Sequence, residues 1–194
     1  MNESITLPKK LEEDIIKRLI DLPYSGYLDV VRRVLSATGY DDVRLLRKGP
    51  ERNNCGGVDL AGMAESGLLR APMVAQAKQY SDPVQKRCIN ELRGVCISSG
   101  AIHGVIISTS PFSDSAIAAA GAGSIMRIRL VPGSELAWLM AVHRIGVSVK
   151  NGKAAVDAGF FDQYSEIGNL GNPLKRTKTD AGSIKVTVSL EHQT

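Results

Sequence analysis

The sequence predicts a single α/β domain in which helices flank a central mixed β-sheet. Its 194 residues, 43% of them hydrophobic, are enough for one full core without dividing the chain. Between residues 84 and 143, helical and strand patterns alternate, as they do in an α/β layer. Ahead of this region, two short β-type segments face each other across a polar turn near Gly67.

Composition limits the class of protein. No apolar run approaches the length of a membrane span, and the N-terminus is too charged for a signal peptide, so no membrane association is expected. Cys55, Cys88 and Cys96 form no Cys-x-x-Cys pair, which favours free thiols in a reducing, cytoplasmic compartment. Gly121, Gly123 and Gly133 do not form a dinucleotide-binding fingerprint, so no nucleotide cofactor is expected. The net charge of +4 permits nucleic-acid binding without requiring it.

Two helices are expected at the N-terminal end. Residues 9–20 carry apolar side chains on one helical stripe and follow Pro8, which suits a helix start. The Leu-Pro-Tyr-Ser-Gly segment at 22–26 is expected to end this helix. A second helix is predicted from Tyr27 to Gly39, where an apolar stripe continues. Residues 1–24 are therefore assigned to an N-terminal helical extension.

Three strands are expected before residue 80. The first lies around Val43, and an irregular run at 49–57 leads from it to the strand of Asp59. In the third strand, alternation places one set of residues on each face of the sheet. Met73, Ala75 and Ala77 share one face, and Val74, Gln76 and Lys78 share the other. With the turn near Gly67, Asp59 falls opposite Gln76, at the roughly 5 Å spacing of cross-strand neighbours.

The remaining chain alternates between helices and strands. A helix is expected to begin at Ser81-Asp82-Pro83, followed by a buried strand at 105–109, a helix at 113–120, a strand around 125–131 and a helix at 134–143. Residues 183–190 alternate strictly between apolar and polar side chains and predict a half-buried strand. Either this strand extends the main sheet or it pairs with another subunit.

Asp59, Gln76 and Lys78 form the candidate site. A carboxylate and an amide carbonyl are hard oxygen ligands suited to Mg²⁺, and a nearby lysine can orient or deprotonate a water for attack on a phosphate. From the residues alone, an ordinary solvent-exposed polar face remains the alternative. Four basic residues precede Asp59, namely Arg44, Arg47, Lys48 and Arg52. They are expected to attract phosphates, with a solvated loop as the alternative.

Four short motifs extend the pattern beyond these residues. In order they are Gly57-Val58-Asp59, Gln76-Ala77-Lys78-Gln79-Tyr80, Glu91-Leu92-Arg93-Gly94 and Gly104-Val105-Ile106-Ile107-Ser108-Thr109-Ser110. Their order resembles the catalytic domain of Mrr-like restriction endonucleases, within the PD-(D/E)xK nuclease superfamily. In that branch a glutamine commonly stands where other members have an acid, as Gln76 does here. The resemblance implies a restriction-endonuclease-like domain at residues 25–162, followed by a C-terminal extension at 163–194.

The resemblance also implies a role for each site residue. Asp59 would bind Mg²⁺, for which Mn²⁺ can substitute, together with the Gln76 side chain and the Ala77 backbone carbonyl. Lys78 would serve the hydrolytic water. DNA contacts would come from Arg44, Arg47, Lys48, Arg52, Gln79 and Tyr80. The sequence departs from the family at Leu28, where a glutamate that supports the metal site is usual. Either Asp29 replaces it from a different face of the helix, or the site works without it.

The implied activity is that of a metal-dependent deoxyribonuclease, a type II or type IV restriction endonuclease that acts on duplex DNA in host defence. The sequence does not fix whether cleavage depends on DNA modification. One site cuts one strand, so cleavage of both strands would need a homodimer or transient pairing of two subunits. Two alternatives remain: a repair or junction-resolving nuclease of the same superfamily, and a non-cleaving DNA-binding module that keeps the fold.

Overall fold

The protein is described by a computed structural model that covers residues 7–46, 57–66, 68–121, 126–150 and 153–169. Within these ranges, five strands form one sheet and two more form a separate hairpin. The helices are α1 (Lys9–Asp21), α2 (Tyr24–Ala37), α3 (Lys86–Ser99), α4 (Asp114–Gly121), α5 (Gly133–Val142) and α6 (Ala158–Asn169). No helix in the described ranges is long and apolar enough to cross a membrane.

The sheet is mixed, as predicted. Its strands are β1 (Tyr40–Leu45), β2 (Leu60–Ser66), β3 (Leu69–Lys78), β4 (His103–Ser108) and β5 (Ile128–Val131), and they lie side by side in this order. The first three pair antiparallel, whereas β4 and β5 run parallel to β3. A tight connection joins the antiparallel strands β2 and β3, and the helical crossovers α3 and α4 join the parallel strands β3, β4 and β5.

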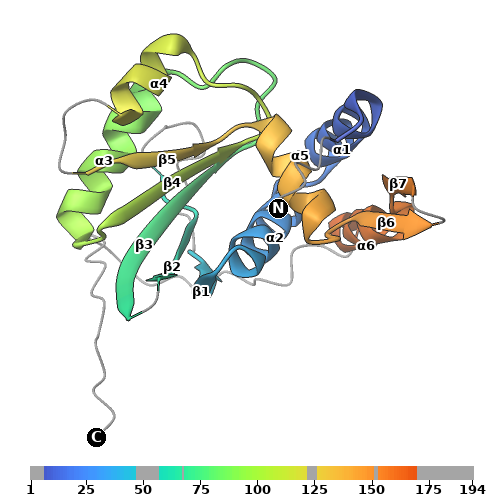
Figure 1. The fold of residues 1–194 in the computed structure, drawn as a ribbon, viewed down its shortest axis with the longest axis horizontal. Helices are drawn as coiled ribbons and strands as arrows, with labels where there is room; N and C mark the ends of the chain where they lie inside the picture. Colours follow the sequence, from blue (N-terminus) through green and yellow to red (C-terminus); the bar gives the residue numbers. More distant parts are fainter. Residues whose placement is uncertain (1–6, 47–56, 67, 122–125, 151–152, 170–194) are drawn as a thin grey trace, which may run out of the picture.

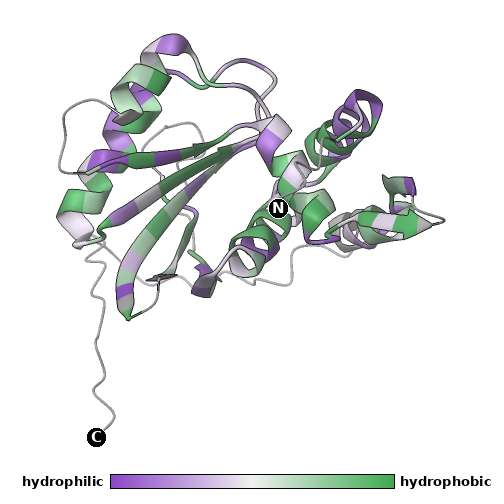
Figure 2. Cartoon of the chain, viewed as in Figure 1, coloured by the Kyte–Doolittle hydropathy of each residue, from purple (hydrophilic) through white to green (hydrophobic). Residues whose placement is uncertain are grey.

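Helices cover both faces of the sheet (Figure 1). One core cluster joins the sheet to α1, α2 and α5, and a second joins it to α3 and α4. The predicted alternation of β3 is confirmed, because Met73, Ala75 and Ala77 belong to the first cluster and Val74 belongs to the second. Figure 2 shows α1 with hydrophilic and hydrophobic residues side by side, as its amphipathic sequence requires.

The junction between the first two helices differs from the prediction. The break is confined to Leu22 and Pro23, and α2 begins at Tyr24 instead of Tyr27. Gly26 suggested a break, but it is buried inside the helix, where an added Cβ would lie 3.1 Å from the side chain of Tyr164. The glycine therefore serves close packing between α2 and α6. Leu11, Ile15 and Leu19 of α1 belong to the first core cluster together with α2 and α5.

The start of α3 also differs from the prediction, since the helix begins at Lys86 and not at Ser81-Asp82-Pro83. The backbone of Val84 is used elsewhere, because its N–H donates to Pro111 (2.9 Å) and its carbonyl accepts from Ser113 (3.0 Å). This short parallel bridge keeps residues 81–85 out of the helix. The following order of α3, β4, α4, β5 and α5 agrees with the predicted alternation.

Beyond α5, the hairpin of β6 (Val147–Lys150) and β7 (Lys153–Val156) and the helix α6 had not been predicted individually. They lie together beside α1 and α2 in Figure 1. The predicted domain boundary at residue 162 falls inside α6, in which Phe161 and Tyr164 are buried in the first core cluster. The strand predicted at 183–190 lies outside the described residues, so it stays a prediction.

Candidate active site

Asp59, Gln76 and Lys78 gather at the end of β3 and are all buried. Their exposed fractions are 1%, 1% and 6%. The β2–β3 register pairs Leu60 with Ala75, which places Asp59, one residue earlier, next to Gln76, as predicted. Gln76 and Lys78 are two residues apart in β3 and so project from the same face. An ordinary solvent-exposed polar face is therefore excluded, because buried polar side chains are costly unless a specific role or partner retains them.

The carboxylate of Asp59 is fixed by hydrogen bonds to both oxygens. Oδ2 accepts from the N–H of Ala77 at 2.8 Å, and Oδ1 accepts from the hydroxyl of Tyr24 at 3.1 Å. The backbone of Asp59 is also fixed, because its N–H donates to Ala75 (3.0 Å) and its carbonyl accepts from Leu46 (2.8 Å). These donors offset the cost of burying the carboxylate and set the direction of its oxygens.

Tyr24 is a site residue that sequence reasoning missed, because the residue lies in the segment expected to be a break. Its hydroxyl lies 3.1 Å from Asp59 Oδ1 and 3.0 Å from the Ala77 carbonyl oxygen. Burial and then the charge of Asp59 raise the pKa of Tyr24 well above its ordinary value, so the hydroxyl stays protonated and acts as a donor. The sequence did carry one signal: Tyr24 and Tyr27 are three residues apart, so a helix that included both would place them on the same face.

Gln76 is held through its amide nitrogen. Nε2 donates to the carbonyl of Gly57 at 2.7 Å. A carboxylate has no hydrogen with which to make this bond, so a glutamine fits the position where other superfamily members carry an acid. The amide oxygen, and not the nitrogen, is the atom of Gln76 that can act as a metal ligand.

Lys78 lies beside a buried polar segment at the end of β4. Its backbone partner across the parallel register is Ser108, and its Nζ is 5.4 Å from the centre of the Tyr80 ring. Ser108, Thr109 and Ser110 are all buried, and the hydroxyls of the two serines are 2.9 Å apart. The side chain of Lys78 is thus mostly excluded from solvent. Away from water, its positive charge acts more strongly on a nearby reacting group.

The residues predicted to contact DNA fall into three groups. Arg44 is exposed on β1, and Tyr80 is 41% exposed and lines a pocket of about 400 Å³ formed by residues 79–85 and Cys88. Gln79 has an internal contact, because its Nε2 donates to the carbonyls of Leu19 (2.7 Å) and Leu22 (2.8 Å) at the end of α1. Arg47, Lys48 and Arg52 lie outside the described residues. DNA contact by any of them stays a prediction.

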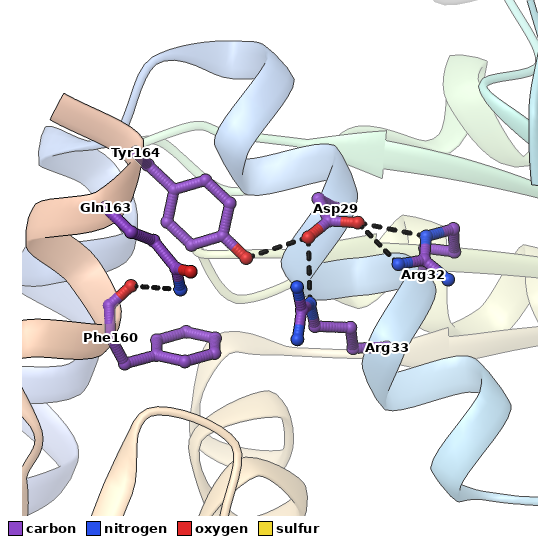
Figure 3. Close-up of polar contacts among 6 residues, drawn as sticks. All are labelled: Asp29, Arg32, Arg33, Phe160, Gln163 and Tyr164. Atoms are coloured by element: carbon purple, nitrogen blue, oxygen red, sulfur yellow. Dashed lines mark hydrogen bonds and ion pairs between the residues drawn. The ribbon is translucent and has the colours of Figure 1, made fainter. Parts of the chain in front are cut away.

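Asp29, the candidate replacement for the helix glutamate, contacts α6 (Figure 3). Its carboxylate accepts from Arg32 (2.7 Å), Arg33 (2.8 Å) and the hydroxyl of Tyr164 (2.8 Å). Partial burial would raise the pKa of Asp29, but the hydrogen bonds from Arg33, Arg32 and Tyr164 outweigh it and lower the pKa. These contacts join α2 to α6, and support of the metal site by Asp29 stays a prediction. Tyr24 is an α2 residue whose side chain does contact Asp59.

The family is decided by the comparison with known proteins. The family model of the Mrr catalytic domain, described as a restriction endonuclease, matches residues 22–140, which is more than half of the chain. The chain belongs to this restriction endonuclease family. The match to the Mrr family contains α2, the five-stranded sheet and all three candidate site residues.

Solved structures support the restriction-endonuclease fold. The DNA modification-dependent restriction endonuclease AspBHI is similar with a TM-score of 0.60 and 16% identity, over 86% of this chain and 45% of that protein. The MspJI restriction endonuclease, solved in complex with a 27-mer oligonucleotide, has a TM-score of 0.51 and 18% identity, over 84% of this chain and 38% of that protein. The Mrr-family chain thus spans less than half of either protein, and at these identities the likeness concerns the fold. No curated protein matches the sequence.

The oxygen atoms at the site suit a divalent cation. Among the described residues, no cluster of three or more histidine, cysteine, aspartate or glutamate side chains is present, so a cation would rely on other oxygen donors. Asp59 supplies a carboxylate, Gln76 an amide oxygen and Ala77 a backbone carbonyl, all of the hard type that Mg²⁺ prefers. The oxygens of Asp59 and Ala77 already converge, since one hydroxyl lies within hydrogen-bond distance of both. The residues therefore fit a single cation site with one carboxylate.

Proposed function

We propose that the chain is a Mg²⁺-dependent endonuclease that hydrolyses phosphodiester bonds in duplex DNA. The observation that carries the proposal is the burial of Asp59, Gln76 and Lys78 together, at the end of β3, in a chain of the restriction endonuclease family. Lysine and aspartate side chains are rarely buried in a domain that has only a structural role, so a buried lysine and a buried carboxylate at the same edge of the sheet favour a catalytic site.

Each residue has a role in the proposed reaction. Asp59, Gln76 and the carbonyl of Ala77 would hold Mg²⁺, for which Mn²⁺ could substitute. Bound there, the cation would neutralise a phosphate oxygen and lower the pKa of a water. Lys78 positions this water and stabilises the charge that develops on the phosphorus oxygens. The water oxygen forms a bond to phosphorus as the bond to the 3′ oxygen breaks, leaving a 5′-phosphate and a 3′-hydroxyl.

Duplex DNA is the proposed substrate. MspJI, which shares the fold, was solved with an oligonucleotide, and AspBHI is a modification-dependent restriction endonuclease. In this chain, the partly exposed ring of Tyr80 lies beside Lys78, and Arg44 is exposed on β1. With Arg47, Lys48 and Arg52, Arg44 would supply positive charge for phosphates. Because one site cuts one strand, we propose a homodimer for cleavage of both strands. Cys96 is a free thiol, which suits a host-defence enzyme of the cytoplasm.

The test is digestion of matched duplexes, one with modified bases and one without, and of four-way DNA, each in the presence of Mg²⁺ or of a chelator, with DNA binding measured on the same substrates. Cleavage only with Mg²⁺, with 5′-phosphates at the mapped ends, is the expected result. Preference for the modified duplex would assign a type IV or modification-dependent enzyme. Cleavage confined to four-way DNA would assign a junction-resolving nuclease instead, and DNA binding without cleavage would assign a binding module.

A further inference from the structure

The hydroxyl of Tyr24 lies where two of the proposed metal ligands converge. Its oxygen is 3.1 Å from Asp59 Oδ1 and 3.0 Å from the Ala77 carbonyl oxygen. A hydroxyl carries one proton, so the two oxygens share it. In this arrangement a neutral donor bridges the carboxylate and the carbonyl.

A cation that used the same two oxygens would compete with this hydroxyl. Mg²⁺ binds oxygens at about 2.1 Å, so a cation bridging the two would lie in the direction in which the Tyr24 proton points. The O–H group of Tyr24 and a cation cannot both occupy that space, because the hydroxyl hydrogen takes up room there and carries partial positive charge. Tyr24 must then turn its proton or its side chain away when the cation arrives.

We propose that Tyr24 is a positioning residue that holds the metal-free site together and is displaced from it by the cation. This inference rests on the proposed function. In the metal-free protein, the buried carboxylate of Asp59 needs hydrogen-bond donors, and Tyr24 and the Ala77 N–H are two of them. The same hydrogen bond that stabilises the metal-free protein opposes cation binding, because the cation binds the state in which that bond is broken.

The position of Tyr24 suits such a role. It is the first residue of α2 and follows Pro23, so it stands at the end of a helix and not in its middle. Gln79, one residue beyond Lys78, donates to the carbonyl of Leu22 at 2.8 Å and so fixes the helix junction beside the site. Displacement of Tyr24 therefore needs a side-chain rotation at a helix end and no shift of the sheet.

The experiment is a titration of the full chain, without DNA, with Mn²⁺ alone. The EPR signal of free Mn²⁺ measures how much of the cation remains unbound. The wild type, Tyr24→Phe, Asp59→Asn and Tyr164→Phe are compared. Tyr164→Phe is the matched control, because it removes a tyrosine hydroxyl that also donates to a carboxylate, that of Asp29 at 2.8 Å. Thermal unfolding without metal records whether each variant is folded, and Tyr24→Met takes the place of Tyr24→Phe if the latter does not fold.

Tyr24→Phe is expected to bind Mn²⁺ about tenfold more tightly than the wild type, the factor that corresponds to one hydrogen bond to a charged group. Tyr164→Phe is expected to bind as the wild type does, and Asp59→Asn is expected to bind much more weakly. Equal or weaker binding by Tyr24→Phe, with wild-type binding that depends on Asp59, overturns this inference and leaves the proposed metal site intact. No Mn²⁺ binding by the wild type overturns the proposed metal site, and the role of Tyr24 with it.

Discussion

Replacing Gln76 by glutamate would introduce the acid that many members of the superfamily carry, yet we expect Gln76→Glu to destabilise the metal-free protein. The side chain is 1% exposed, and its Nε2 donates to the Gly57 carbonyl at 2.7 Å. A carboxylate at this position would have no proton for Gly57, and it would add a second negative charge next to Asp59. Both effects oppose folding unless a cation is bound.

The size of the effect follows from the lost contact. A buried acceptor left without a donor costs about 1–3 kcal/mol, and the repulsion between two carboxylates adds to it. A total of about 3 kcal/mol would lower the unfolding temperature by roughly 6–12 °C for a chain of this length. Mg²⁺ would restore much of this loss, because it neutralises the added charge.

The pH dependence has a definite sign. Burial and the charge of Asp59 would raise the folded-state pKa of the new carboxyl group above its unfolded value of about 4.3. Below the unfolded pKa, the group is protonated in both states and can donate to Gly57, so the variant loses little. As the pH rises above the unfolded pKa, the unfolded chain releases this proton while the folded protein retains it. The free energy of unfolding of the variant therefore falls further below that of the wild type.

Thermal unfolding of the wild type and Gln76→Glu at pH 5 and pH 7.5, with chelator and with Mg²⁺, measures both effects. Gln79→Glu is the matched control, because Gln79 also donates to backbone carbonyls but supplies no proposed metal ligand. We expect Mg²⁺ to rescue Gln76→Glu and not Gln79→Glu. The reasoning is refuted if Gln76→Glu is as stable as the wild type at pH 7.5 in chelator, or if its loss is greater at pH 5.

Two further predictions concern the scaffold. Gly133→Ala would place a Cβ 2.2 Å from the Thr109 carbonyl oxygen, and we expect a loss of about 1–3 kcal/mol in urea unfolding. Gly94→Ala is its control, because nothing lies within 4 Å of the added Cβ, and alanine in this helix should stabilise the protein by up to about 1 kcal/mol. Equal losses of stability in the two variants would argue against the clash. Asp29→Asn should cost about 1 kcal/mol at pH 7, a figure kept low because Arg33 is about half exposed and screened by solvent. Since folding lowers the pKa of Asp29 from 3.8, this contribution is present above that value and is lost as the pH falls below it. An effect of Asp29→Asn that is equal at pH 7 and pH 3 in denaturant titrations would contradict this assignment.

Short-range patterns in the sequence predicted the sheet well. Alternation in β3 separated Met73 from Gln76 and Lys78 correctly, because the period of a strand is a property of neighbouring residues. Helix ends were predicted less well, because distant residues determine them. The glycine at position 26 packs against Tyr164, and Val84 pairs with the backbone around Phe112. Neither contact is visible in the local sequence.

The polar contacts of the site show the same limit. The resemblance singled out Asp59, Gln76 and Lys78, and the structure brings them together in a buried cluster. Tyr24 and Asp59 are 35 residues apart, and Asp29 and Tyr164 are 135 residues apart. No periodicity connects such pairs, so sequence reasoning proposed Asp29 and did not find the contact of Tyr24 with Asp59. The fold fixes which side chains of α2 reach the site, and Tyr27 does so as well, because its hydroxyl donates to the Lys78 carbonyl at 3.3 Å.

The most direct test of the central claim is the cleavage rate of Lys78→Ala, measured on duplex DNA with Mg²⁺ beside the wild type. Lys78 is 6% exposed, so it adds little to the charge that the surface presents to DNA. We predict that the cleavage rate falls about 10²- to 10⁴-fold, as expected for loss of a group that acts on the water, while the dissociation constant for DNA is nearly unchanged. Cleavage by Lys78→Ala at the wild-type rate would contradict the assignment of this site as the nuclease centre.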